Sequence, residues 1–336
     1  KGTEMTKLAT TALLVPLLLG ACSRDPGPES MAEAQADEAV GLAGAARGDN
    51  RLLPVLDELL TLRPPPNPAR NAYFGDLHVH TAYSFDAYAF GTTSTPDDAY
   101  RYARGRSLEH PSGYSVQLRQ PLDFYAVTDH AMFLGLVKEA ADTSTTFSRY
   151  PVATPLHHIN APGNMNAASL GPRGRAFASF VPATLQGLLE GRIDPAIVEA
   201  VGRSAWRDSV RAANEAYVAG SFTTFAAFEY TSTTASRGNL HRNVIFRDTA
   251  RLPALPFSRF KSQNPEGLWD WMDGLREQGV ESLAIPHNSN ISNGRMFSVD
   301  YPGTDGIDEE RARAALRVKV EPVVEVMQHK GDSECR

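Results

Sequence analysis

The sequence predicts an α/β fold in which short strands of a parallel sheet or barrel alternate with helices. Two observations favour this fold class. From Tyr73 onward, apolar runs of strand length alternate with longer stretches of helical periodicity. Polar residues, several of them histidines, follow the apolar runs, and α/β enzymes build their sites at such strand ends. The 336 residues suffice for one large domain of this class.

The segment before this domain is expected to direct export. The apolar run from Leu8 to Leu19 is too short to span a bilayer but has the length of a signal-peptide core. It ends in Leu19-Gly20-Ala21-Cys22, which resembles a lipobox, so residues 1–21 are predicted to be a lipoprotein signal peptide and Cys22 the lipidated residue. An ordinary secretory signal is the alternative. The predicted location is the periplasmic side of a bacterial envelope, with the lipid anchor as the only membrane contact.

Residues 23–50 are rich in Ala, Gly, Asp and Glu and lack a convincing apolar face, and a proline-rich stop follows at 64–68, so residues 22–70 are predicted to be a flexible tether. The domain is expected over residues 71–336, with a mainly helical insertion at about 140–220. Its strands are predicted at 73–81, 122–129, 222–230, 243–247, 282–286 and 323–327.

Two helix starts can be recognised in the domain. Thr95-Pro96-Asp97-Asp98 has an N-cap residue, a proline at the first helical position and acids in the first turn, and Asn264-Pro265-Glu266 has the same pattern. Inside the insertion, helices are expected near 182–190 and 195–217.

Composition restricts the function classes. The net charge is −6 and the basic residues are scattered, so no nucleic-acid partner is expected. The only two cysteines, Cys22 and Cys335, offer neither a disulfide framework nor a thiolate metal site. A metal ion would have to be held by histidines and carboxylates.

The most informative motif is Asp76-Leu77-His78-Val79-His80-Thr81. Because side chains alternate along a strand, His78 and His80 are expected to point the same way, with Leu77 and Val79 packed behind. Two imidazoles placed like this can hold one divalent ion. Taken alone the pair is only moderately specific.

Further candidate ligands follow along the chain. A single histidine is more often structural than a ligand, but five of the nine lie at or just beyond expected strand ends. Glu229 ends an apolar run, where a buried carboxylate needs a cation or a donor. Imidazoles and carboxylates without thiolates suit Zn²⁺, Mn²⁺ or Fe²⁺. The complete candidate set is His78, His80, Asp86 in the loop after the first strand, His130, Glu229, His241 and His287.

In this order these residues resemble the successive motifs of the PHP (polymerase and histidinol phosphatase) superfamily. The flanking Tyr73-Phe74-Gly75-Asp76 and Gly238-Asn239-Leu240-His241-Arg242-Asn243 are similar to its branch called DUF3604. The resemblance implies a distorted seven-stranded β/α barrel with two or three metal ions. It places His78 and His80 on the first ion, Glu229 as a bridge to a second ion bound by His241 and His287, and Asp86 with His130 on a third.

One motif of that superfamily is missing. The late Asp-x-His motif is not found, and Asp332 is a poor substitute for it. We therefore expect a C-terminally truncated chain with an incomplete barrel, and whether this fragment is itself active stays open.

The resemblance and the ligand set predict a metal-dependent hydrolase of small phosphate or sulfate esters. Clustered divalent ions lower the pKa of a bound water, so that a metal-bound hydroxide forms near neutral pH. Arg242, Asn243 and Asn288 are the expected substrate contacts. One alternative is a non-catalytic, lipid-anchored lipoprotein that binds a metal or ligand. An amidohydrolase-like barrel is less favoured, because no lysine ends a central strand.

Overall fold

The computed structural model describes residues 70–332, apart from 235–237, 300, 302 and 329. The predicted signal peptide, the lipidation site Cys22 and all but the last residue of the tether lie outside this part, so those predictions are not tested. Among the described residues, no helix has the length and apolar character needed to cross a membrane.

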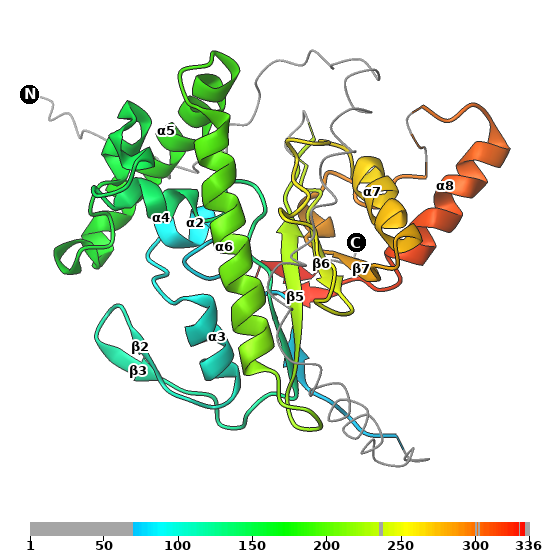
Figure 1. Ribbon diagram of the computed structural model, residues 1–336, viewed down its shortest axis with the longest axis horizontal. Coiled ribbons are helices and arrows are strands. Elements are labelled where there is room, and N and C mark those ends of the chain that lie inside the picture. The colour runs from blue at the N-terminus through cyan, green and yellow to red at the C-terminus, as the bar shows by residue number, and fades with distance from the viewer. Residues whose placement is uncertain (1–69, 235–237, 300, 302, 329, 333–336) are drawn as a thin grey trace, which may run out of the picture.

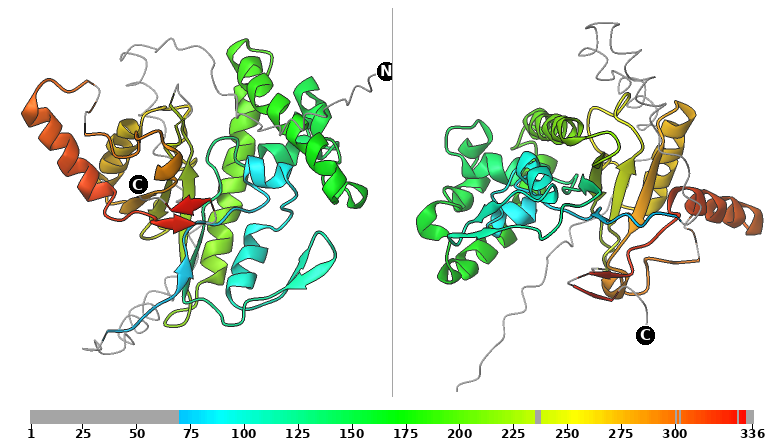
Figure 2. Two further views of the ribbon diagram at one scale, coloured as in Figure 1. Left: turned by 180° about the vertical axis from the view of Figure 1, so that it is seen from behind. Right: turned by 90° about the horizontal axis from the view of Figure 1, so that it is seen from below.

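The centre of the molecule is a mixed five-stranded sheet that curls into half a barrel (Figures 1 and 2). Strands β1, β4 and β5 are parallel, whereas β6 is antiparallel to both of its neighbours, so β7 runs in the direction of β5. In sheet order the strands are β1 (Gly75–Asp76), β4 (Phe124–Val127), β5 (Thr223–Tyr230), β6 (Arg242–Phe246) and β7 (Ser282–Pro286).

The reversed β6 corrects the expectation of a purely parallel sheet. Only residues 231–241 connect β5 to β6, whereas a parallel crossover needs a dozen residues or more and usually contains a helix. A connection of this length is too short for a parallel crossover, so β6 pairs with β5 in the antiparallel direction. As a consequence, the start of β6 lies at the same sheet edge as the ends of the other four strands.

The predicted strand at 323–327 was also wrong. Residues 321–326 have no strand assignment, although the Glu325 backbone N–H donates to the Pro286 carbonyl at 3.0 Å. Pro322 has no N–H to donate to a ladder at the start of this segment. The chain then forms a small antiparallel hairpin of β8 (Met327–Gln328) and β9 (Gly331–Asp332), separate from the main sheet.

Helices cover the outer face of the half barrel. Helices α3 (Pro96–Ala103) and α6 (Pro195–Ala216) pack on β4 and β5, and α7 (Pro265–Glu277) and α8 (Ile307–Val320) pack on β7. The largest buried cluster of this layer includes Trp206, Phe228 and Trp269. A smaller cluster around Ala126, Ala227 and Ile245 fills the inner face. The outer face is therefore covered by helices, whereas the inner face carries a smaller cluster whose flanking apolar residues are only partly buried.

The remaining helices form a lobe with its own apolar core at one side of the sheet (Figure 1). Most of its helical elements lie in the region where helical structure was expected, but α6, also in that region, packs on α3 and β5 as part of the layer over the sheet. The elements of the lobe are α2 (Phe85–Ala89), α4 (Leu136–Ala141), η2 (Phe147–Arg149), η3 (Pro151–Leu156), η4 (Pro162–Asn164), η5 (Ala167–Ser169) and α5 (Leu170–Leu189).

One of the two predicted caps forms as expected. Thr95 caps α3 through a reciprocal bond with Asp98, a complete capping box. Helix α7 begins at Pro265 as predicted, but the Asn264 side chain makes no capping hydrogen bond, which corrects that detail.

Candidate metal centre

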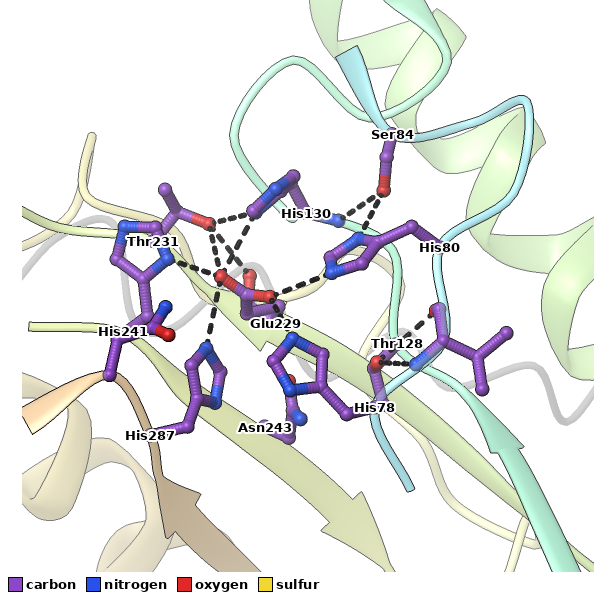
Figure 3. Close-up of polar contacts among 12 residues, drawn as sticks. His78, His80, Ser84, Thr128, His130, Glu229, Thr231, His241, Asn243 and His287 are labelled. Carbon is purple, nitrogen blue, oxygen red and sulfur yellow. Dashed lines mark hydrogen bonds and ion pairs between the residues drawn. The ribbon is translucent and has the colours of Figure 1, made fainter. Parts of the chain in front are cut away.

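The candidate ligands converge at the sheet edge formed by the ends of β1, β4, β5 and β7. Glu229, at the end of β5, lies in the middle with 1% of its side chain exposed, and five histidines surround its carboxylate (Figure 3). The histidine nitrogens lie at the following distances from a Glu229 oxygen: His241 2.5 Å, His80 3.1 Å, His130 3.1 Å, His78 3.5 Å and His287 3.5 Å.

His78 and His80 follow β1 on a segment that is not a regular strand. The backbone of Val79 accepts from the Thr128 N–H at 2.8 Å and donates to the Thr128 hydroxyl at 2.8 Å, which ties the segment to the end of β4. Both histidines face Glu229, so they point the same way, as expected. Leu77 and Val79 do not pack behind them as a pair, because they join two different apolar clusters on opposite faces of the sheet.

A buried carboxylate orients His80. Asp129 accepts from the Thr81 N–H and hydroxyl, both at 2.6 Å, and from the Ser84 hydroxyl at 2.7 Å. Since the single proton of Ser84 is donated there, the 2.8 Å contact between Ser84 Oγ and His80 Nδ1 requires the imidazole to donate. The lone pair of neutral His80 therefore lies on Nε2, the atom that faces Glu229. Burial raises the pKa of Asp129, although its hydrogen bonds oppose the shift.

Asp86 and His130 form a second part of the centre. Asp86 lies in the short helix α2, not in the expected loop, and its carboxylate is 3.2 Å from His130 Nε2. The other ring nitrogen of His130 contacts Glu229 and, at 2.5 Å, the Thr231 hydroxyl. His130 therefore links Asp86 to the central carboxylate.

His241 and His287 close the opposite side. His241 immediately precedes β6 and reaches this edge because β6 is reversed. His287 follows β7 and is fully buried, yet neither of its ring nitrogens has a hydrogen-bond partner in the described part of the chain. Buried polar atoms without partners are unfavourable, and imidazole nitrogens that lack one suit a metal ion.

Glu325 was missed by the sequence analysis. Its Oε2 atom lies 2.6 Å from His78 Nδ1, and its Oε1 atom has no partner among the described residues. The segment was interpreted as one more strand without a ligand. The signal was nevertheless present: a single acid stands inside the apolar run Val323-Val324-Glu325-Val326-Met327, as Glu229 does in its own run.

The three predicted substrate contacts have different environments. Arg242 is 1% exposed and points to the outer face, where it pairs with Glu321 at 2.7 Å, so its guanidinium is committed to a buried ion pair and not to the centre. Asn243 lies beside Glu229 on the inner face and donates to the Leu77 carbonyl at 3.0 Å. Asn288, directly after His287, has a left-handed backbone with φ 60°.

The two asparagines each retain an unused polar atom. For Asn243 the atom is Oδ1 and for Asn288 it is Nδ2, both buried and without a partner in the part of the chain that the structure describes. The Asn288 amide therefore offers a free donor next to a candidate ligand.

The electrostatics follow from this crowding. Burial alone would raise the pKa of Glu229, but the charges of His130, His287 and His241 lower it well below its ordinary value. Burial lowers the pKa of His287 to about 4. Burial also lowers the pKa of His78, but the hydrogen bonds and charges of Glu229 and Glu325 outweigh it and raise this pKa to about 9. The carboxylate at the centre is thus ionised at neutral pH.

Within the part of the chain that the structure describes, four groups of three residues could each hold a metal ion, with their potential ligand atoms within 4.8 Å of one another. Each consists of two histidines and one carboxylate, a donor set used by Zn²⁺ and Fe²⁺ sites that keep open positions. The groups are His78, His80 and Glu229; His78, His287 and Glu325; His80, Asp86 and His130; and His130, Glu229 and His241. All seven predicted ligands belong to at least one group.

The family described as "Protein of unknown function (DUF3604)" matches residues 67–336. No curated protein and no solved structure matches the chain.

Proposed function

The chain belongs to the DUF3604 family, and because that family is described as of unknown function, we propose from the site that this protein is a metal-dependent hydrolase of phosphate or sulfate esters. The main observation in support is the convergence of five histidines and three carboxylates on one sheet edge, in groups that fit divalent ions. For the whole domain we propose an incomplete PHP-type barrel of the distorted seven-stranded kind, of which the curled sheet is a part.

The ligand set favours two ions held at once rather than three. A neutral imidazole has one lone pair, so it binds one ion, whereas a carboxylate can bridge two. Among the four groups, His78, His80 and His130 each belong to two. Two groups that share a histidine cannot both be filled, so at most two of the four are filled together.

The chain's own residues then set the charge and orientation of the site. Bound divalent ions supply Lewis-acid activation of water and neutralise negative charge on the group attacked. Asp129 and Ser84 hold His80 with its lone pair toward Glu229. Two divalent ions would bring four positive charges against three from the carboxylates that can ligate them, Asp86, Glu229 and Glu325, so the ions and these ligands together would carry about one net positive charge. That balance favours an anionic substrate.

We propose that two groups near the centre, the buried Asn288 amide and the exposed Lys330 ammonium, bind ester oxygens. Asn288 has a free amide donor beside His287. Lys330 is exposed, and its charge acts on both His241 and Glu325, which puts a cation beside the mouth of the site. An ammonium and an amide donor suit the tetrahedral oxygens of phosphate and sulfate alike.

The test combines metal content with turnover of aryl phosphates and aryl sulfates. Purified protein should contain about two divalent ions per chain and hydrolyse one ester class. His78→Ala/His80→Ala leaves intact only the group of His130, Glu229 and His241, so it should bind no more than one ion and lose turnover. The variant Glu277→Gln, at an exposed position on α7, is the matched control and should keep the metal content and the turnover. A metal-free, inactive wild type refutes the hydrolase. Bound metal without turnover favours the metal-binding lipoprotein instead.

A further inference from the structure

The segment after α8 has an inverted pattern of exposure. Val324 and Val326 are 42% and 52% exposed, whereas the acid between them, Glu325, turns inward with its side chain 18% exposed. Valine ordinarily favours burial and a carboxylate favours water. An arrangement with the acid inside and the valines outside indicates that something positive on the inside holds the carboxylate.

The backbone places Glu325 directly beside His287. Its N–H donates to the carbonyl of Pro286, the residue before His287, at 3.0 Å. The His287 and His78 rings lie with centroids 4.2 Å apart, and Glu325 Oε2 is 2.6 Å from His78 Nδ1. Three potential ligands from three distant parts of the chain therefore meet here.

An ion pair with His78 alone does not account for this corner of the centre. That pair uses one carboxylate oxygen and one imidazole nitrogen. Glu325 Oε1 and both ring nitrogens of His287 are buried without a hydrogen-bond partner among the residues described, and the nearest carboxylate oxygen to His287 Nε2 belongs to Glu229, at the long distance of 3.5 Å. A cation bound between the three side chains would satisfy the carboxylate and one nitrogen of each ring.

We infer that Glu325 is a metal ligand and that, with His78 and His287, it forms a two-histidine, one-carboxylate site for a divalent cation at the β7 side of the centre. This deepens the proposed function, on which it rests. When this site is filled, His78 is not available to the group with His80 and Glu229. The second ion then lies in one of the two groups that contain His130.

The experiment is a Co²⁺ titration of the metal-free full chain, followed by d–d absorbance, with total metal measured after dialysis. Wild type should bind two ions. Glu325→Gln keeps the shape and the hydrogen bond to His78 but removes the charge, so one ion should bind at least about 100-fold more weakly. Glu277→Gln is the control and should bind as wild type does.

The readout separates this inference from the proposed function. If the wild type binds no metal, the hydrolase proposal fails and the inference with it. If the wild type binds two ions and Glu325→Gln binds two with unchanged affinity, only the inference is overturned. If circular dichroism shows that Glu325→Gln does not fold, Glu325→Asp replaces it. The shorter side chain of aspartate should lower the affinity for one of the two ions, and unchanged affinity for both overturns the inference.

His287→Gln gives an independent check. It should lose the same ion as Glu325→Gln, so the double variant should still bind one ion. A double variant that binds none shows that the two residues serve different ions and contradicts the assignment.

Discussion

The buried ion pair between Arg242 and Glu321 permits a quantitative prediction. Glu321, directly after α8, is 2% exposed and accepts from Arg242 Nε at 2.7 Å, from the Trp269 indole at 2.7 Å and from Arg317 Nε at 3.1 Å. Glu321→Ala removes the acceptor and leaves the Arg242 charge buried. Removing one partner of a buried pair destabilises by about 3–5 kcal/mol, so we expect a loss of about 4 kcal/mol.

The assay is denaturant unfolding of the metal-free protein in the presence of a chelator, followed by circular dichroism. The chelator prevents bound metal from adding its own stabilisation. Asp97→Ala is the matched control, because Asp97 pairs with Arg211 on the surface with both side chains more than 40% exposed. Such a pair contributes about 0–1 kcal/mol.

Two results would refute this reasoning. One is a loss below about 1 kcal/mol for Glu321→Ala, equal to that of the surface control. The other concerns Arg242→Met/Glu321→Met. This double variant should be less destabilised than Glu321→Ala, because the fully buried Arg242 charge is removed together with its carboxylate partner, while Arg317 loses that partner in both variants. A double variant that is less stable than the single one contradicts the proposed origin of the effect.

Three further predictions concern the metal centre and the anchor. Glu229 and Glu325 raise the pKa of His78 to about 9, and Asp86 and Glu229 raise that of His130, so both are protonated at pH 7 without metal. Metal binding should therefore release about two protons per chain at pH 7 and fewer as the pH rises toward 9, and the metal affinity should fall as the pH is lowered. Calorimetry in two buffers of different ionisation enthalpy measures the number of protons released, and zero release contradicts the prediction. Ser84→Ala frees His80 to take the other tautomer and should weaken metal binding by about 10–100-fold, measured by competition with a chelator, whereas Ser144→Ala, at a loop remote from the centre, should not. Palmitate labelling in a bacterial host should mark the wild-type chain and not Cys22→Ser, and equal labelling would disprove the lipobox.

Much of the centre was predictable because its residues end strands. The shared edge of neighbouring strands brings His78, His80, His130, Glu229 and His287 together, although His78 and His80 lie on an irregular segment after β1 where strand alternation does not hold. His241 was less secure from sequence, since its position depends on the direction of β6, which the short 231–241 connection determines and hydrophobic patterning does not.

Other features depend on tertiary packing, and the local sequence does not show which residues they contact. Arg242 follows a ligand and was expected to bind substrate, but alternation on β6 turns it to the outer face, where Glu321 from a distant helix end meets it. Glu325 was overlooked because an acid in an apolar run gives no hint of its partners, which lie 247 positions away in the case of His78. Residues this far apart in sequence are related only by the completed fold.

The reversed β6 also has a consequence for the order in which the centre forms during folding. Glu229 and His241 are joined by the short link of an antiparallel strand pair, whereas His78 and Glu325 close a loop of 247 positions. With closure entropy growing as the logarithm of loop length, the longer closure is less favourable by about 3 kcal/mol. Local contacts of this kind form early. We therefore expect Glu229 and His241 to meet first, and the contact between the two ends of the domain to form last.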